Sequence, residues 1–241
     1  MKTIYQFGDS YGALLYNEDE SYTIKNFVEL AANQLNYRYV NQALGGSSNE
    51  MILNKILSYI NEIISGDILI INFSFFTRGS WYDNRDGKIK STNVLYSDMR
   101  GTKQYSRAKN EHVVKLVEYY LEHAKDYNKR IFTLINSTLK AIEQRGVAIF
   151  YIFVDESEWA DSLLDVGTNI KFPNGFGRWL QKNKLHLEQE GHYTKGIQIP
   201  LASMLLEKTQ HFKQTDRSVF VNFEDLDLNA VLSKPVKEKM L

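Results

Sequence analysis

The stretch Asp67-Ile68-Leu69-Ile70-Ile71-Asn72-Phe73 decides the fold of this chain. Its aliphatic run leaves neither face of an extended strand polar, which is typical of a central strand in a parallel sheet covered on both sides. Residues 147–154 form a second run of the same kind. Because helical segments lie between the strand-like runs, the sequence predicts an α/β protein built on a parallel sheet.

Strand-like and helix-like segments also alternate on the N-terminal side of this stretch. Residues 3–7 predict a short buried strand, and apolar side chains then recur at helical spacing from Ile24 to Leu35. Residues 37–40 predict a second strand, and the apolar residues of 49–64 again have the period of a helix. Strand followed by helix is therefore the recurring unit.

The C-terminal side continues this alternation after a long polar insertion. Residues 78–109 are too many for an ordinary connection, so we predict a functional or mobile insertion there. Beyond it the sequence predicts helices near residues 112–125 and 130–144, the strand at 147–154, a loop to about residue 186, a helix near 190–208 and a strand-like run at 218–223. We expect one domain over residues 1–210, with the insertion at 78–109, and a C-terminal extension over residues 211–241.

Composition excludes several classes of protein. The 241 residues include no cysteine, which rules out disulfides and cysteine-ligated metal centres, and the five histidines form no HExxH pair, so we expect no metal site. The 29 basic side chains balance the 29 acidic ones, which removes the positive footprint of a general nucleic-acid binder. We see neither an apolar leader nor a run of 18 apolar residues, and we expect a cytoplasmic protein without a membrane or nucleic-acid partner.

The first candidate for chemistry is Gly8-Asp9-Ser10-Tyr11-Gly12, directly after the first predicted strand. Ligand sites of parallel α/β sheets lie at the carboxyl ends of the strands, which is where this motif falls. It formally matches the G-x-S-x-G turn of α/β-hydrolases, but that fold needs several strands before its serine and Ser10 has one. We expect Asp9 to hold the turn through hydrogen bonds to the backbone, as Asx side chains commonly do.

Two further motifs follow later in the chain. Asn41-Gln42-Ala43-Leu44-Gly45-Gly46-Ser47-Ser48-Asn49 comes after the second predicted strand, and His186-Leu187-Glu188-Gln189-Glu190-Gly191-His192 precedes the last predicted helix. Glycine lets the backbone approach a substrate closely, and a helix N-terminus presents unpaired N–H groups. The glycine pair therefore suits the binding of an oxyanion.

Together the three motifs resemble the conserved blocks of the SGNH (GDSL) hydrolases, in a phage-type or divergent branch. The resemblance implies a three-layer α/β/α fold of flavodoxin type. It implies that Ser10 is the nucleophile, that the N–H groups of Ser10 and Gly46 form the oxyanion hole, and that His186 is the general base. It implies no cofactor.

The sequence departs from the family's pattern at two places. Where the family has Gly-x-Asn-Asp after its central strand, this chain has Ser74 at the glycine and Phe76 at the asparagine, so Asn72 or Arg78 is the candidate to replace the lost amide. Where the family has an aspartate before the histidine, this chain has Asn183. Its amide oxygen can orient an imidazole without supplying charge, and a backbone carbonyl of the 155–185 loop is the alternative.

The insertion at 78–109 mixes basic and aromatic side chains, among them Arg78 and Trp81, and such a mixture suits a sugar or an anionic glycan. Arg78 is either a ligand for a substrate anion or an anchor for the insertion, and the aromatic residues equally suit packing on their own domain. We therefore expect a serine esterase or acetyl esterase that hydrolyses an O-acyl ester of a carbohydrate or a similar small substrate. The alternatives are an acyltransferase and a catalytically silent structural or glycan-binding protein.

Overall fold

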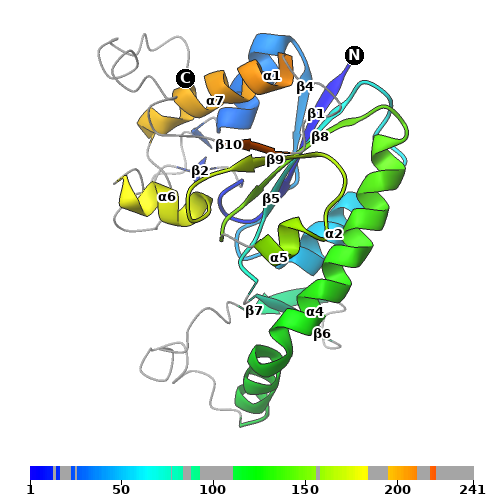
Figure 1. Ribbon diagram of the computed structural model, residues 1–241, viewed down its shortest axis with the longest axis vertical. Coiled ribbons are helices and arrows are strands. Elements are labelled where there is room, and N and C mark those ends of the chain that lie inside the picture. Colours follow the sequence, from blue (N-terminus) through cyan, green and yellow to red (C-terminus); the bar gives the residue numbers. More distant parts are fainter. Residues whose placement is uncertain are drawn as a thin grey trace.

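A computed structural model describes residues 1–12, 15–16, 23–24, 26–76, 78–83, 88–92, 111–155, 158–183, 195–210 and 218–220 (Figure 1). Its centre is a sheet of six strands in the order β10-β9-β8-β5-β1-β4, in which every pair is parallel. These strands are β1 (Thr3–Gly8), β4 (Arg38–Asn41), β5 (Ile68–Phe73), β8 (Ala148–Phe153), β9 (Thr168–Lys171) and β10 (Ser218–Phe220).

Counted along the chain, the strands of this sheet lie in the order 6-5-4-3-1-2. This is the flavodoxin-type order with one more parallel strand at the edge. The predicted three-layer α/β/α fold of flavodoxin type is therefore confirmed.

Helices cover both faces of the sheet (Figure 1). One face packs against α1 (Phe27–Leu35), α6 (Phe176–Lys182) and α7 (Lys195–Gln210). The other packs against α2 (Asn49–Ser58), α4 (Glu111–Glu143) and α5 (Glu158–Asp161). Two short antiparallel pairs lie outside the sheet, β2 (Leu15–Tyr16) with β3 (Thr23–Ile24) and β6 (Gly79–Asp83) with β7 (Lys88–Thr92).

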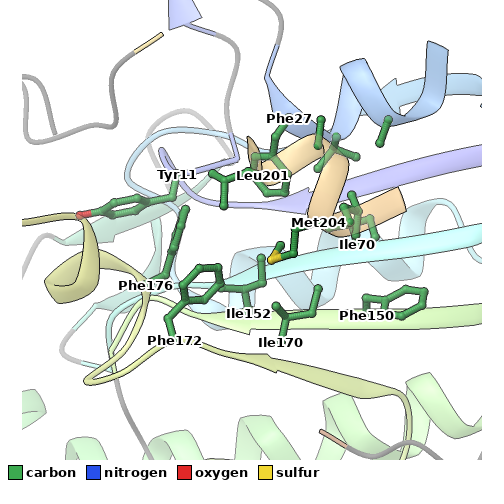
Figure 2. Close-up of a cluster of buried hydrophobic side chains, with 14 of the residues drawn as sticks. Tyr11, Phe27, Ile70, Phe150, Ile152, Ile170, Phe172, Phe176, Leu201 and Met204 are labelled. Atoms are coloured by element: carbon green, nitrogen blue, oxygen red, sulfur yellow. The ribbon is translucent and has the colours of Figure 1, made fainter. Parts of the chain in front are cut away.

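The buried strands divide their side chains between two cores, as the apolar run at 67–73 predicts. In β5, Ile68 and Ile70 belong to one core, whereas Leu69, Ile71 and Phe73 belong to the other. Figure 2 shows the first core, in which Phe27, Phe176 and Leu201 from three helices meet strand residues. All six residues of β5 are buried.

The structure differs from the sequence predictions in the second half of the chain. The two helices expected near 112–125 and 130–144 form one helix, α4, because no glycine or proline interrupts the segment between them. The segment expected to be a loop before residue 186 contains β9 and the short helix α6. In β9 the buried residues Thr168 and Asn169 are polar, so the strand lacks an apolar pattern in the sequence. The run predicted within the C-terminal extension supplies β10, which pairs with β9 in the main sheet.

One predicted helix ends earlier than its periodicity suggests, and another is described only in part. The helix expected over 49–64 ends at Ser58, and the one expected from about 190 is described from Lys195. Among the described helices, none has a stretch long and apolar enough to cross a bilayer.

Candidate functional site

The candidate site lies where β1 and β5 run side by side in the middle of the sheet. The chain leaves β1 toward β4 on one side and leaves β5 toward β8 on the other, so their carboxyl ends form the switch point at which open α/β sheets bind ligands. Gly8 closes β1 against Asn72, and an added Cβ would lie 2.7 Å from Asn72 Cβ and 2.9 Å from its carbonyl oxygen. Only glycine fits this approach without a shift of backbone.

Ser10 lies in a tight turn that Asp9 stabilises through hydrogen bonds to the backbone. The Asp9 Oδ1 atom accepts a hydrogen bond from the N–H of Tyr11 at 3.0 Å, and the Asp9 carbonyl accepts one from the N–H of Gly12 at 3.0 Å. The expected role of Asp9 in the turn is confirmed. The ring of Tyr11 packs edge-on against Phe176, which anchors the turn in the core shown in Figure 2.

Ser10 itself is partly exposed at the top of this turn. Among the described residues, none hydrogen-bonds to its hydroxyl or to its backbone N–H. Both groups of Ser10 are thus uncommitted within the described part of the chain.

The glycine loop after β4 lies beside Ser10, as the resemblance to the SGNH hydrolases implies. The N–H of Leu44 donates to the Gly8 carbonyl at 3.0 Å, and a Cβ added to Gly45 would lie 3.8 Å from Ser10 Cβ. Gly46 has φ 80°, a left-handed conformation that favours glycine. Ser48 then begins α2 as its N-cap, with its Oγ accepting from the N–H of Met51 at 3.3 Å.

A buried ion pair supports the turn from the other side. Arg78 Nη1 lies 2.9 Å from Asp9 Oδ2, and the two side chains are 5% and 0% exposed. Ser74 completes the cluster, since its Oγ lies 3.1 Å from the same carboxylate oxygen and 2.9 Å from the same guanidinium nitrogen. Burial raises the pKa of Asp9 to about 6, although the Arg78 charge and the hydrogen bonds from Tyr11 and Ser74 lower it.

Asn49 ties this cluster to the helix that follows the glycine loop. Its Oδ1 accepts from the N–H of Ser74 at 2.8 Å, and its Nδ2 donates to the Ser74 carbonyl at 3.2 Å. The chain leaving β5 is therefore fixed against the start of α2.

The three predicted substrate-binding residues have different places. Asn72 is fully buried, with its Oδ1 accepting from Gln6 Nε2 at 3.1 Å and its Nδ2 without a partner among the described residues. Arg78 is committed to Asp9, with its guanidinium 4.9 Å from the centre of the Phe75 ring. In this structure these two side chains support the Ser10 turn rather than face solvent. Trp81 belongs to β6, the first strand of the insertion.

The predicted base and its partner lie near the end of α6. His186 falls outside the described residues, so its role stays a prediction. Asn183 is the C-cap of α6 and its Nδ2 donates to the Trp179 carbonyl at 2.8 Å, which leaves its Oδ1 as the atom that could accept from an imidazole.

Phe76, at the position of the family's asparagine, packs into the other core. Its ring centre lies 4.9 Å from that of Trp159 and 5.6 Å from that of Phe132. The side chain at this position supplies no hydrogen-bond donor.

The sequence reasoning missed Asp155, which lies two residues beyond the end of β8. Burial raises the pKa of its carboxyl group, and the positive charges of Arg178 and Arg78 oppose that rise. The signal that could have found it is its position just after a strand that is apolar on both faces. The described residues contain no group of three or more histidines and acidic side chains able to hold a metal ion.

Comparisons with known proteins find similarity among solved structures alone. No protein-family model matches the chain, and no curated protein matches it. A structural-genomics target from Bacillus subtilis has a TM-score of 0.47 and 12% identity, over 87% of this chain and 57% of that chain. This chain therefore spans less than two thirds of the length of that protein.

Two other neighbours are esterases. The psychrotrophic esterase EstA from Pseudoalteromonas has a TM-score of 0.45 and 11% identity, over 87% of this chain and 97% of that chain. An acetyl xylan esterase from the rumen bacterium Butyrivibrio proteoclasticus has a TM-score of 0.41 and 12% identity, over 87% and 64% of the two chains.

Proposed function

We propose that this protein is a serine esterase of the SGNH type, which hydrolyses an O-acyl ester of a carbohydrate or a similar small substrate. The observation that carries the proposal is the setting of Ser10. A partly exposed serine with an uncommitted hydroxyl stands at the switch point of the sheet, beside a glycine loop that leads into a helix N-terminus. Such a constellation suits acyl transfer.

In the proposed reaction, Ser10 Oγ attacks the acyl carbon while its proton passes to the imidazole of His186. The N–H groups of Ser10 and Gly46 donate to the oxyanion that forms. The imidazolium then gives its proton to the leaving alkoxide, and an acyl-serine remains. Water, deprotonated by the same imidazole, releases the acid and restores Ser10.

The chain route supports the assignment of the base. β10 runs parallel to the other strands, so the chain enters it at the amino edge of the sheet. The helix before it, α7, therefore runs from the carboxyl edge, where Ser10 lies, toward the amino edge. His186 precedes Lys195, the first residue of α7, by nine residues in the sequence.

Phe76 bears on the expected rate. An oxyanion donor at an active serine is worth about 3–4 kcal/mol, and the phenyl ring at this position donates none. We therefore expect turnover below that of an enzyme with three donors.

The insertion supports a carbohydrate substrate. Arg78, bound to Asp9 below Ser10, directly precedes β6, so the strand that carries Trp81 starts beside the candidate site. Aromatic faces and basic groups are suited to sugar rings and anionic glycans.

Labelling with a fluorophosphonate tests this function without knowledge of the substrate. We expect covalent labelling of the wild-type protein at Ser10, and none of Ser10→Ala or His186→Ala. Ser137→Ala, an exposed serine on α4, is the matched control and should label like wild type. Equal labelling of Ser10→Ala and wild type contradicts the proposed nucleophile.

The same experiment separates the two alternatives. A protein that labels at Ser10 but releases acid from esters only when an alcohol acceptor is absent is an acyltransferase, since both activities use one acyl-serine. A folded wild-type protein inert to the probe and to small activated esters is the silent homologue, whose insertion should then be tested for glycan binding.

A further inference from the structure

Asp155 directly follows Val154, which contacts the first turn of α6. The N–H of Gly177, in the first turn of α6, donates to the carbonyl of Val154 at 3.0 Å. A Cβ added to Gly177 would lie 3.1 Å from the hydroxyl of Tyr11 and 3.2 Å from Val154 Cγ1. The neighbours of Ser10 and of Asp155 in the sequence thus meet at the same turn of helix.

The carboxylate of Asp155 has no hydrogen-bond partner or ion-pair partner among the described residues, although it is partly buried. The charged groups that act on it are Arg178 and Arg78, and Arg78 is already bound to Asp9. The two buried acids in the described part of the chain, Asp9 and Asp67, are satisfied, and Asp67 accepts from the N–H groups of Thr3 and Ile64.

A partly buried carboxylate without a partner carries a desolvation cost that a structural role does not explain. At the carboxyl edge of a parallel sheet, such a group is suited to hold a positive charge that forms during a reaction.

Asn183 is less suited to that task. It is the C-cap of α6, six residues beyond Gly177, which corresponds to about 9 Å along a helix axis. Its amide nitrogen is bonded back to its own helix, and an amide oxygen carries no charge with which to stabilise an imidazolium.

We propose that Asp155 is the acid of the site and acts in place of the aspartate missing before His186. Asp155 is a positioning residue: its carboxylate accepts the N–H of one ring nitrogen of the imidazole, while the other ring nitrogen takes the proton of Ser10. The negative charge of the Asp155 carboxylate stabilises the imidazolium. This inference rests on the proposed esterase function.

The decisive variant is Asp155→Asn, with Asp165→Asn as its matched control. Asp165 is exposed, paired with Lys140 at 2.6 Å, and precedes β9 at the opposite edge of the sheet. We expect Asp155→Asn to lower kcat toward a small activated ester by about 10²- to 10⁴-fold, and Asp165→Asn to leave kcat unchanged.

Two readouts separate this role from a structural one. The acidic limb of the kcat/KM profile should move to lower pH in Asp155→Asn, because a carboxylate beside an imidazole favours its protonated form. The midpoint of urea unfolding should stay equal or rise, because the amide removes a desolvated charge. Asp155→Glu should recover part of the lost kcat.

Failure of the inference is distinct from failure of the proposed function. If Ser10 labels with fluorophosphonate and Asp155→Asn keeps the kcat and pH profile of wild type, the function stands and Asp155 is not the acid. A loss of kcat in Asp155→Asn that comes only with a lower unfolding midpoint, and without a moved acidic limb, also overturns the inference. If wild type neither labels nor hydrolyses, the function itself is wrong.

Discussion

The ion pair between Asp9 and Arg78 holds the turn that carries Ser10, and both of its charges are buried. The pKa of Asp9 is raised from its ordinary 3.8 to about 6, chiefly by burial. Between these two pH values the folded protein binds more of this proton than the unfolded chain does. The contribution of Asp9 therefore makes the free energy of unfolding fall as pH rises from about 4 to about 6.

The first residue-scale prediction concerns Arg78→Met. Removing the guanidinium leaves an unpaired carboxylate in the interior, so we expect the free energy of unfolding to fall by about 3–5 kcal/mol at pH 8. The loss should be smaller at pH 5, since loss of the arginine charge raises the pKa of Asp9 further and the carboxyl group is then neutral in the folded state. Urea unfolding at the two pH values measures both effects.

The control is the double variant with Asp9→Asn, which removes both charges. We expect it to recover most of the stability lost by Arg78→Met and to show no difference between pH 5 and pH 8 at this site, because no carboxyl group remains. A loss in Arg78→Met that is the same at both pH values would mean that Asp9 is not the group left unpaired.

Single residues also show where sequence reasoning reaches its limit. The turn made by Asp9 could be predicted because an Asx side chain bonds its own backbone two residues on, so the interaction is local. The pairing of Asp9 with Arg78 joins residues 69 apart, and neither the hydrogen-bond partners nor the burial of the two can be deduced from the motif.

At the scale of elements, the approach of β1 to β5 determines where Ser10 stands. Gly8 pairs with Asn72 at the last position of the register, where there is no room for a side chain. This contact also positions the turn that follows, because Gly12 packs against the same end of β5. A Cβ added to Gly12 would lie 2.9 Å from Asn72 Oδ1.

We therefore predict that Gly8→Ala is destabilising and impairs the site. The methyl group would overlap Asn72 Cβ and its backbone, and overpacking of this kind costs about 1–3 kcal/mol. Thermal unfolding measures the loss, and fluorophosphonate labelling should slow more than stability alone explains, since β1 must shift and Ser10 with it. Gly45→Ala is the stability control, because its Cβ would have an ordinary contact of 3.8 Å, and an equal loss in both variants would contradict the argument.

The central strands, which have an apolar run, were predicted well, whereas β9, which has none, was not. β5 and β8 have aliphatic side chains on both faces, so their type and place follow from the sequence. β9 buries Thr168 and Asn169 instead, and Asn169 Nδ2 is bonded to Asp161 at 2.9 Å. A strand that buries polar side chains, hydrogen-bonded to residues of another element, lacks the apolar pattern by which a strand is predicted from a sequence.

On the scale of the whole molecule, the strand order brings together residues far apart in the sequence. Ser10 and Gly45 lie side by side because β4 is the neighbour of β1, and Ser74 reaches Asp9 because β5 is the neighbour of β1 on the other side. The parallel sheet could be predicted from alternating strands and helices, and the edge that carries the site follows from a general rule for such sheets. The strand-like run at 218–223 was also predicted, but its pairing with β9 was not, since a three-residue strand carries too little pattern to indicate its partner.

That last strand yields a prediction for the intact chain. β10 adds hydrogen bonds along β9 and makes β9 an interior strand, so Ser218–Phe220 belong to the main sheet. A chain ending at Gln210 loses β10 and exposes the edge of β9, whereas a chain ending at Asn222 keeps the strand and serves as the control. We expect the first truncation to lower the urea midpoint, because backbone groups of β9 lose their partners, and to increase aggregation through the open edge. The second truncation should unfold at a higher urea concentration than the first. Equal midpoints for the two truncations would show that the pairing of β10 with β9 contributes nothing to stability.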